Sequence, residues 1–280
     1  MTATVLILTR NAGAAFAETL AAVRAQQPPP LEILIVDSAS TDGTVERSRD
    51  AGARIHPIAL AEFDFGLTRD LGYSLARGEL VANLSQDVIP RDGGWLRKHT
   101  ERFSDPTIAA TTARCEARDP ERMFLWQRMG RFYSTSELER FRARYGVPVS
   151  NANSAVRREV ALKLPHGPMP IAEDLLFQKR AIEAGYRIAW IDEATAWHQH
   201  QFTLSSAFKR AFNEGIAARR LEIPYGLADG VLDALRPAHW MALARQAAYG
   251  RARAPVDFLY PLLRPLGVCL GHRFGRRLWR

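Results

Sequence analysis

The fold of this chain is decided by the stretch Leu31-Glu32-Ile33-Leu34-Ile35-Val36-Asp37-Ser38-Ala39-Ser40-Thr41-Asp42-Gly43-Thr44. Its first six residues are apolar apart from one glutamate, which is typical of a short strand buried in a sheet. The polar residues that follow prefer loops and helix N-termini, so a helix is expected over about residues 45–50. The stretch therefore predicts a strand, a loop and a helix in succession.

The same succession recurs through the first 95 residues. Further strands are expected at 5–8, 54–58 and 80–84, and helical patterns at 16–23 and 68–77. Beyond residue 95 we expect helices near 95–103, 158–164 and 173–184, strands near 108–113, 154–156 and 187–191, and a loop-like or helical stretch at 119–147. Strands that alternate with helices predict an α/β fold with a doubly wound, mostly parallel sheet.

The basic residues are unevenly distributed along the chain. Residues 201–280 contain 13 Lys/Arg and 5 Asp/Glu, a net charge of +8 that equals the net charge of the whole chain. They read as helices broken by prolines, among them Pro261 and Pro265. We therefore expect a basic helical extension whose partner is an anionic surface: lipid headgroups, a polyprenyl diphosphate or nucleic acid. Helices that only cover the main domain remain the alternative.

Length and composition favour a globular protein of the cytoplasm. A chain of 280 residues, 47% of them apolar, can bury a substantial core. Cys115 and Cys269 are too few for a disulfide framework or a zinc site, which favours a reducing compartment. The first residues lack the pattern of a signal peptide, and no apolar run reaches the roughly 18–20 residues of a membrane span. We expect a cytoplasmic protein, free or peripheral at the inner face of the plasma membrane.

Two aspartates follow apolar strands, where parallel sheets bind their ligands. Asp37 ends one strand and Asp87 lies just beyond another. An unpaired buried carboxylate is costly, so Asp87 is expected to face the crevice, where its oxygens suit Mg²⁺ or Mn²⁺. Asp37, at the tip of its strand, is expected to contact a ligand, with an ordinary helix cap as the alternative. The alternative for Asp87 is a turn acid before Pro90. Asp42 is interpreted as a helix cap.

An acidic pair and two histidines complete the candidate site. Glu173 and Asp174 begin a helix, where one carboxylate can cap the helix while the other faces the cleft as a base. His198 and His200 alternate as on an extended segment and can serve as neutral metal ligands. The alternatives are ordinary first-turn acids and a His-x-His without partners.

Taken in order, seven segments resemble the family-two inverting glycosyltransferases of the A-type fold, and most closely their rhamnosyltransferase-like members. The segments are Leu8–Asn11, Ile35–Thr44, Gly66–Gly72, Leu84–Asp87, Asn151–Ala155, Ala172–Asp174 and His198–Phe202. The resemblance covers residues 4 to about 215. It implies a glycosyltransferase domain over 1–200, with a nucleotide-sugar-binding half at 1–95 and an acceptor-binding half at 96–200, followed by the basic helical region 201–280.

The resemblance also implies the site residues. The nucleotide-sugar contacts would be Thr9, Asn11, Asp37, Arg69, Gln86 and Asp87, with the base at Asp37 and the diphosphate near Arg69. Acceptor contacts would be Asn151 and Asn153, the general base Asp174 with Glu173 beside it, and the ligands of a divalent cation Asp87 with His198 or His200.

The implied reaction moves a sugar from a dTDP-, UDP- or GDP-linked donor to a hydroxyl of a cell-surface glycan or lipid-linked saccharide, in polysaccharide biosynthesis. Two departures stand out: Ser85 occupies the place of the first acid of the family's Asp-x-Asp motif, and Phe65 a place where relatives often carry histidine. The alternatives are an inactive nucleotide-sugar-binding partner and, less favoured, a nucleotidyltransferase. With this acceptor, a membrane surface is favoured over nucleic acid as the partner of the basic region.

Overall fold

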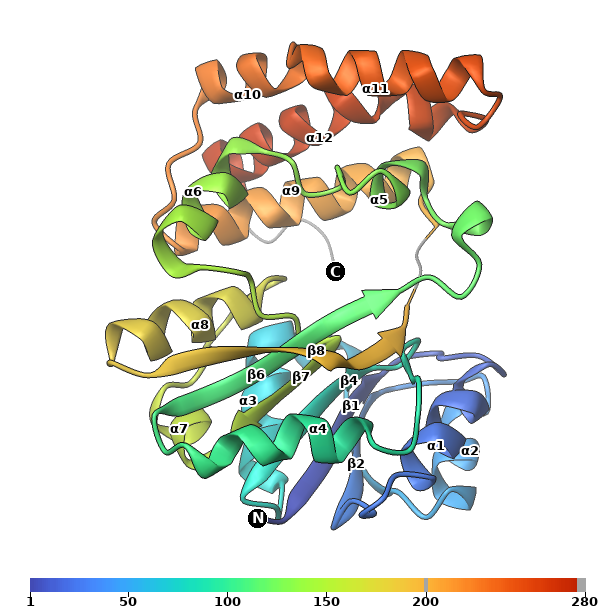
Figure 1. Cartoon of the computed structure of the whole chain (residues 1–280), viewed down its shortest axis with the longest axis vertical. Coiled ribbons are helices and arrows are strands. Elements are labelled where there is room, and N and C mark those ends of the chain that lie inside the picture. The colour runs from blue at the N-terminus through green and yellow to red at the C-terminus, as the bar shows by residue number, and fades with distance from the viewer. Residues whose placement is uncertain (199–200, 276–280) are drawn as a thin grey trace. The chain divides into compact units, whose positions relative to one another are not determined.

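The computed structural model describes residues 1–198 and 201–275 (Figure 1). Strands and helices succeed one another in the first of these ranges, whereas the second is helical. The chain forms two units. The sheet unit consists of Met1–Glu116, Val147–Met169 and Glu173–His198. The helical unit consists of Ala117–Gly146, Pro170–Ala172 and the described residues from 201 onward. Residues 117–146, which we expected in the first 200-residue domain, therefore group with the C-terminal helices.

Within the described residues, the sheet unit contains one eight-stranded sheet in the order β3-β2-β1-β4-β7-β6-β8-β5. Its strands are β1 (Ala3–Thr9), β2 (Glu32–Ser38), β3 (Arg54–Ile58), β4 (Leu80–Ser85), β5 (Ile89–Pro90), β6 (Ile108–Glu116), β7 (Asn153–Arg157) and β8 (Arg187–Trp197). Strands β3, β2, β1 and β4 are mutually parallel, and so are β6 and β8. Strand β7 is antiparallel to β4 and β6, and β5 to β8. The α/β sheet predicted from the sequence is confirmed, with β7 as an inserted antiparallel strand.

Apolar side chains on both faces of the sheet explain why its strands read as continuous hydrophobic runs. Successive residues of a strand point to opposite faces, so Val5 and Ile7 join the core beneath α1, whereas Leu6 joins the core with Tyr73 of α3. The helices of this unit are α1 (Phe16–Arg24), α2 (Thr44–Asp50), α3 (Phe65–Leu75), α4 (Trp95–Thr100), α7 (Arg158–Lys163) and α8 (Glu173–Glu183), with 3-10 turns at Leu60–Glu62 and Glu101–Ser104. Because helices and apolar side chains cover both faces of the sheet, a ligand-binding site is expected at the ends of the strands.

The helical unit is built on the long helix α12. Its elements are a 3-10 turn at Pro120–Arg122 and the helices α5 (Leu125–Arg128), α6 (Ser136–Tyr145), α9 (Leu204–Arg220), α10 (Leu227–Ala234), α11 (Pro237–Ala248) and α12 (Pro255–Phe274). Helix α12 packs along α9 and also contacts α10 and α11 (Figure 1). Among the described helices, none combines the length and apolar character needed to cross a membrane.

The predicted proline breaks at Pro261 and Pro265 were wrong, because α12 continues through both. Proline removes one backbone hydrogen bond from a helix. Both prolines are buried in α12, which packs along α9, and such tertiary packing can stabilise a helix that its local sequence disfavours. Pro237 and Pro255 instead occupy the first position of α11 and α12, where proline is well suited.

Candidate active site

Most candidate residues of the sheet unit meet at one edge of the sheet. In the parallel strands, Thr9 is the register partner of Asp37, and Leu8 is the partner of Ser85. Because β7 runs antiparallel to β4, its first residues lie at the same edge, beside Leu84. The loop that precedes β7 therefore reaches the carboxyl ends of β1, β2 and β4, where ligands of α/β sheets bind.

The Asp37 carboxylate is buried and held by two neighbouring hydroxyls. Thr9 Oγ1 donates to Asp37 Oδ2 at 2.7 Å, and Ser40 Oγ donates to the same oxygen at 2.6 Å. The Ser40 backbone N–H donates to Oδ1 at 2.9 Å. A carboxylate can accept about four hydrogen bonds, so Asp37 keeps some acceptor capacity while its orientation is fixed.

Polar side chains brace the loops around Asp37. The Asn11 backbone N–H donates to Ser40 Oγ, and Asn11 Oδ1 accepts from the Thr41 N–H, each at 2.8 Å. Gln86 bonds the backbone of Arg10 through both ends of its amide, at 2.8 and 3.3 Å. Asn11 and Gln86 thus fix the loop after β1, the first against the β2 loop and the second against the residues after β4.

Asp42, interpreted as a cap, is structural as expected. Its carboxylate accepts from Thr44 and from the Gly13 N–H at 2.7 Å. These bonds hold the start of α2 against the loop that follows β1.

The acidic pair of α8 is clamped by Asn151. The Asn151 backbone N–H donates to Asp174 Oδ2 at 3.0 Å, and its side-chain Nδ2 donates to Glu173 Oε1, also at 3.0 Å. Asp174 Oδ1 also accepts the Leu175 backbone N–H at 2.9 Å. One asparagine therefore positions both carboxylates, and Asp174 keeps a partly exposed side chain.

The Asp174 carboxyl is an unusually good proton acceptor. Burial, followed by the charge of the adjacent Glu173, raises the pKa of Asp174 to about 7. The hydrogen bonds from Asn151 and Leu175 and the charge of Arg69 act in the opposite direction. A base with a pKa near the working pH is efficient in proton transfer.

Arg69 lies inside the sheet unit, where its guanidinium contacts the acidic pair. Its Nη1 lies 3.3 Å from Asn83 Oδ1 and its Nη2 lies 3.6 Å from Glu173 Oε1, and the side chain is 4% exposed. We expected this residue near a diphosphate at a helix N-terminus. It lies within α3 rather than at a helix N-terminus, and it pairs with Glu173. Its place near a diphosphate stays a prediction.

Asn83 links Arg69 to the loop of Asn151. Its Nδ2 donates to Asn151 Oδ1 at 3.1 Å and to the Tyr73 hydroxyl at 3.0 Å. Sequence reasoning did not include Asn83, Tyr73 or Ser40 in the site. The available signal for Asn83 was a single amide within an otherwise apolar strand, because a buried amide requires partners.

Asp87 and His198 come together from two different loops. His198 Nε2 lies 3.4 Å from Asp87 Oδ2, because β8 ends beside β5 just after Asp87. When two side-chain atoms each bind the same ion at about 2.0–2.1 Å, the distance between these two atoms is similar to the one between His198 Nε2 and Asp87 Oδ2. A carboxylate and an imidazole therefore fit a divalent cation at this position.

No group of three His, Cys, Asp or Glu side chains that could hold a metal occurs among the described residues. His200, the other histidine named as a ligand, lies outside the described residues. Burial, and then the charge of Asp87, raises the pKa of Cys115 to about 12, so that thiol is protonated at neutral pH. From the described residues, a cation would thus have Asp87 and His198 as its ligands, with the remaining positions open to a substrate.

Asn153 has a different place from the one expected of an acceptor contact. Its Oδ1 accepts from Trp95 Nε1 at 2.7 Å and lies 3.0 Å from His99 Nε2. Its Nδ2 donates to the carbonyls of Arg114 and Ala194 at 3.2 and 2.9 Å. The side chain is fully buried, and these four bonds use its hydrogen-bonding groups within the core.

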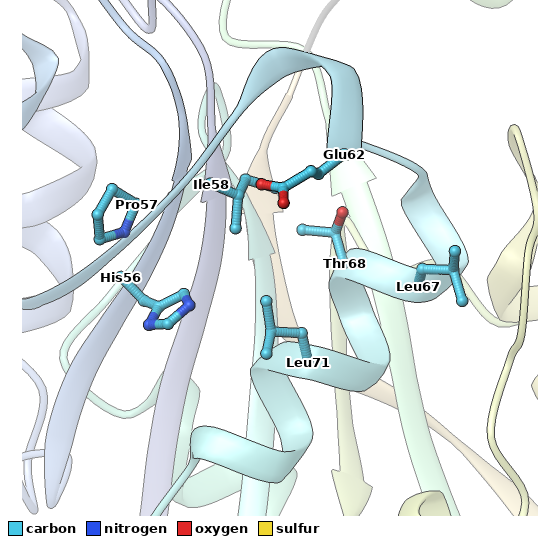
Figure 2. A pocket seen from close by; sticks show the side chains of 7 residues that line it. All are labelled: His56, Pro57, Ile58, Glu62, Leu67, Thr68 and Leu71. Carbon is cyan, nitrogen blue, oxygen red and sulfur yellow. The ribbon is translucent and has the colours of Figure 1, made fainter.

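A hollow of about 380 Å³ opens between the end of β3 and α3 (Figure 2). Its lining residues are His56, Pro57 and Ile58 of β3, Leu67, Thr68 and Leu71 of α3, and Glu62 between them. Pro57 is the register partner of Asp37. The hollow therefore lies on the β2 side of the ligand-binding edge.

Comparison with known proteins agrees with this geometry. The family model described as "Glycosyl transferase family 2" matches residues 4–164. The chain belongs to glycosyl transferase family 2. It is 30% identical over 226 residues to O-antigen chain rhamnosyltransferase RfbN of Salmonella typhimurium, covering 77% of this chain and 72% of that protein. It is 30% identical over 223 residues to O-antigen chain rhamnosyltransferase WbaN of Salmonella anatum, covering 76% and 71%.

Solved structures of glycosyltransferases have the same fold. Mannosyltransferase PcManGT from Pyrobaculum calidifontis, in complex with GDP-Man and Mn²⁺, matches with a TM-score of 0.65 at 19% identity, over 97% of this chain and 87% of that one. Glucosyl-3-phosphoglycerate synthase from Mycobacterium tuberculosis, with Mg²⁺ and UDP, matches with a TM-score of 0.62 at 20% identity, over 80% of each chain. The resemblance to the rhamnosyltransferase-like A-type enzymes is thus confirmed, and the inactive partner is not favoured.

Proposed function

We propose that this glycosyltransferase transfers a rhamnosyl residue, with inversion, from a nucleoside-diphosphate donor to a hydroxyl of a growing lipid-linked polysaccharide. The observation that carries the proposal is the clamped acidic pair: Asn151 holds Asp174 and Glu173 at the ligand-binding edge of the sheet. The two relatives named O-antigen chain rhamnosyltransferases support the choice of sugar and acceptor.

Asp174 is the proposed general base. Its raised pKa suits removal of the proton from the acceptor hydroxyl as that oxygen attacks the anomeric carbon. Attack from the face opposite the leaving diphosphate inverts the configuration. Glu173 remains with Arg69 and supplies the negative charge that makes Asp174 more basic.

The donor is proposed to bind along the ends of β1, β2 and β4. Asp37, fixed by Thr9 and Ser40, would accept a hydrogen bond from the nucleoside base. The adjacent hollow is lined by apolar residues and by His56, Glu62 and Thr68, and it offers room for a flat ring or a ribose. Asn11 and Gln86 would support donor binding by holding the loops at these strand ends in place. Arg69 would act on the site by pairing with Glu173.

Asp87 and His198 are the proposed protein ligands of a divalent cation, with His200 as the alternative or additional ligand. When bound, Mg²⁺ or Mn²⁺ would stabilise the negative charge of the departing nucleoside diphosphate. The half-exposed Asp87 leaves room for diphosphate oxygens at the same ion. The cations of the similar solved structures support this proposal.

Because the proposed acceptor is lipid-linked, the proposed site of action is the cytoplasmic face of the inner membrane. Asn151 is the candidate acceptor contact that remains, since Asn153 belongs to the core. The basic region from residue 201 would face the anionic lipids that surround a lipid-linked saccharide.

The test is a thermal-shift panel of dTDP-rhamnose, UDP-glucose and GDP-mannose, each with and without Mn²⁺. A ligand at 100 times its dissociation constant stabilises the folded state by roughly 2.7 kcal/mol. We expect one nucleotide to raise the melting temperature in a Mn²⁺-dependent manner, and Asp87→Asn to remove the metal dependence. Stabilisation by none of the donors would contradict the proposal. Binding without transfer to a lipid-linked acceptor would contradict the choice of acceptor.

A further inference from the structure

Helix α10 of the helical unit buries a charged side chain and exposes its apolar ones. One of its two acidic residues, Asp233, is completely buried, whereas Leu232, and Leu235 just after the last helical residue, are 69% and 65% exposed. In a globular protein the apolar side of an amphipathic helix normally faces the core. Leu227 and Val231 are exposed on the same helix, so α10 presents an unbroken apolar side to its surroundings.

The inner side of α10 explains this orientation. Asp233 accepts hydrogen bonds from the backbone and side chain of Ser136, at 2.9 and 2.8 Å, and from the Tyr225 hydroxyl at 2.9 Å. Asp229 pairs with Arg140 of α6 at 2.5 Å. These polar contacts attach the helix to its unit, so its leucines are not required for that attachment.

The neighbouring helices α11 and α12 bury apolar side chains such as Leu243 and Val268, but they also expose others. On α11, Trp240 and Met241 are exposed, the latter by 67%. On α12, the buried side contains the charged residues Asp257 and Arg264. Its exposed side contains Phe258, Leu259, Leu262 and Leu266, at spacings of three and four residues that place them along one stripe.

The charge on these helices selects the partner. Residues 227–280, which include all three helices, contain nine Lys/Arg and three acidic residues. Two of the acidic residues, Asp233 and Asp257, are buried, and so is Arg264. Arg245 lies one turn beyond Met241 on the exposed side of α11, and Arg273 continues the exposed stripe of α12. A second copy would bring two basic surfaces together, whereas a bilayer with anionic headgroups satisfies both the apolar side chains and the arginines.

We propose that the exposed sides of α10, α11 and α12 form a membrane-docking surface that inserts its leucines and aromatic rings among the acyl chains of an anionic bilayer. The arginines bind the phosphates of the headgroups. This inference rests on the proposed function, in which the basic region faces the lipids around the acceptor, and it names the surface that contacts the bilayer. Vesicle binding is measured without donor or acceptor, so either proposal can fail without the other.

The test is co-sedimentation of the full chain with vesicles of equal parts phosphatidylcholine and phosphatidylglycerol, and with vesicles of phosphatidylcholine alone. Leu232→Gln with Leu235→Gln removes two exposed leucines without a change of charge. The matched control is Leu31→Gln with Leu162→Gln, two exposed leucines of the sheet unit. We expect the first pair to weaken binding to the anionic vesicles at least roughly tenfold, and the control pair to bind as the unaltered chain does.

A second double variant, Arg245→Gln with Arg273→Gln, tests the charge and keeps the proposal testable if the leucine variant does not fold. It should weaken binding to the anionic vesicles and leave the weak binding to phosphatidylcholine unchanged. The proposal is overturned if the unaltered chain does not sediment with anionic vesicles, or if folded leucine and arginine variants sediment as it does. A dimer in size-exclusion chromatography that only Leu232→Gln with Leu235→Gln dissociates, with unchanged vesicle binding, would identify a second copy as the occupant instead.

Discussion

At the scale of single residues, catalysis depends on a proton acceptor whose basicity is set by its neighbours. Asp174→Asn removes the base but keeps the shape and the hydrogen-bond geometry around Asn151. We expect kcat to fall by about 100- to 10,000-fold with little change in donor affinity. Single-turnover transfer and donor titration measure the two quantities separately. Asp50→Asn, an exposed acid on α2, is the control, and equal losses of donor affinity and rate would argue against the role of Asp174 as base.

The charges around Asp174 predict opposite shifts of the pH profile. The rate requires deprotonated Asp174, so it should fall as the pH drops through about 7, the pKa raised by burial and Glu173. Glu173→Gln keeps the acceptor for Asn151 but removes the charge, and should move this acid limb to lower pH. Arg69→Met removes a charge that lowers the same pKa, and should move the limb to higher pH. A purely structural role for both residues would reduce the rate and leave the pH midpoint in place.

At the scale of elements, the helical unit depends on the close approach of α9 and α12. A Cβ on Gly215 would lie 2.1 Å from the carbonyl oxygen of Val268, so the helices must separate in Gly215→Ala. We expect a loss of roughly 1–3 kcal/mol in the free energy of unfolding, measured by urea denaturation. In Gly230→Ala the nearest atom lies at 3.6 Å, and alanine in this helix should raise stability by up to about 1 kcal/mol. Equal effects of the two changes would exclude helix contact as the cause.

Arg264 joins α12 to α6 and α9 through buried charges. It pairs with Glu137 at 3.2 Å and with Glu214, and it is itself buried. Arg264→Met leaves these carboxylates without their cation and should cost about 3–5 kcal/mol near neutral pH. Burial already raises the pKa of Glu137, and the loss of Arg264 raises it further. The cost should therefore shrink as the pH falls and the carboxyl takes up a proton, which unfolding curves at several pH values would reveal. The exposed Arg251→Met is the control, and a cost independent of pH would contradict this account.

At the scale of the whole molecule, the charge is segregated: residues 201–280 carry the net charge of +8, and residues 1–200 carry none. Salt screens exposed charges beyond about 8 Å at physiological ionic strength and about 3 Å at 1 M. We therefore expect transfer to a membrane-embedded acceptor to decrease as salt increases, while transfer to a water-soluble acceptor analogue stays nearly constant. Parallel salt dependence of the two rates would assign the effect to the active site instead.

The sequence determined the local features of this protein. Continuous apolar runs predicted β1, β2 and β4, and the spacing of Phe16, Leu20 and Val23 predicted the buried side of α1. The loop after β2 predicted Asp42 as a structural cap, and its carboxylate accepts from Thr44, two residues further on. These features follow from interactions among residues that are close in the chain, so a single sequence is sufficient to reveal them.

Only the tertiary structure decided which polar groups meet. Asn151 reaches Asp174 because β7 inserts antiparallel beside β4, and the same insertion buries Asn153, its near neighbour in sequence. Arg69 pairs with Glu173, which lies more than 100 residues away in the sequence. Helix α10 exposes its leucines because the hydrogen-bond partners of Asp233 lie inside the helical unit. Sequence pattern reports which side chains are apolar or charged along one element. The choice of partner depends on which elements become neighbours, because the cost of burying a polar group is offset only by a partner that the fold brings within hydrogen-bonding distance.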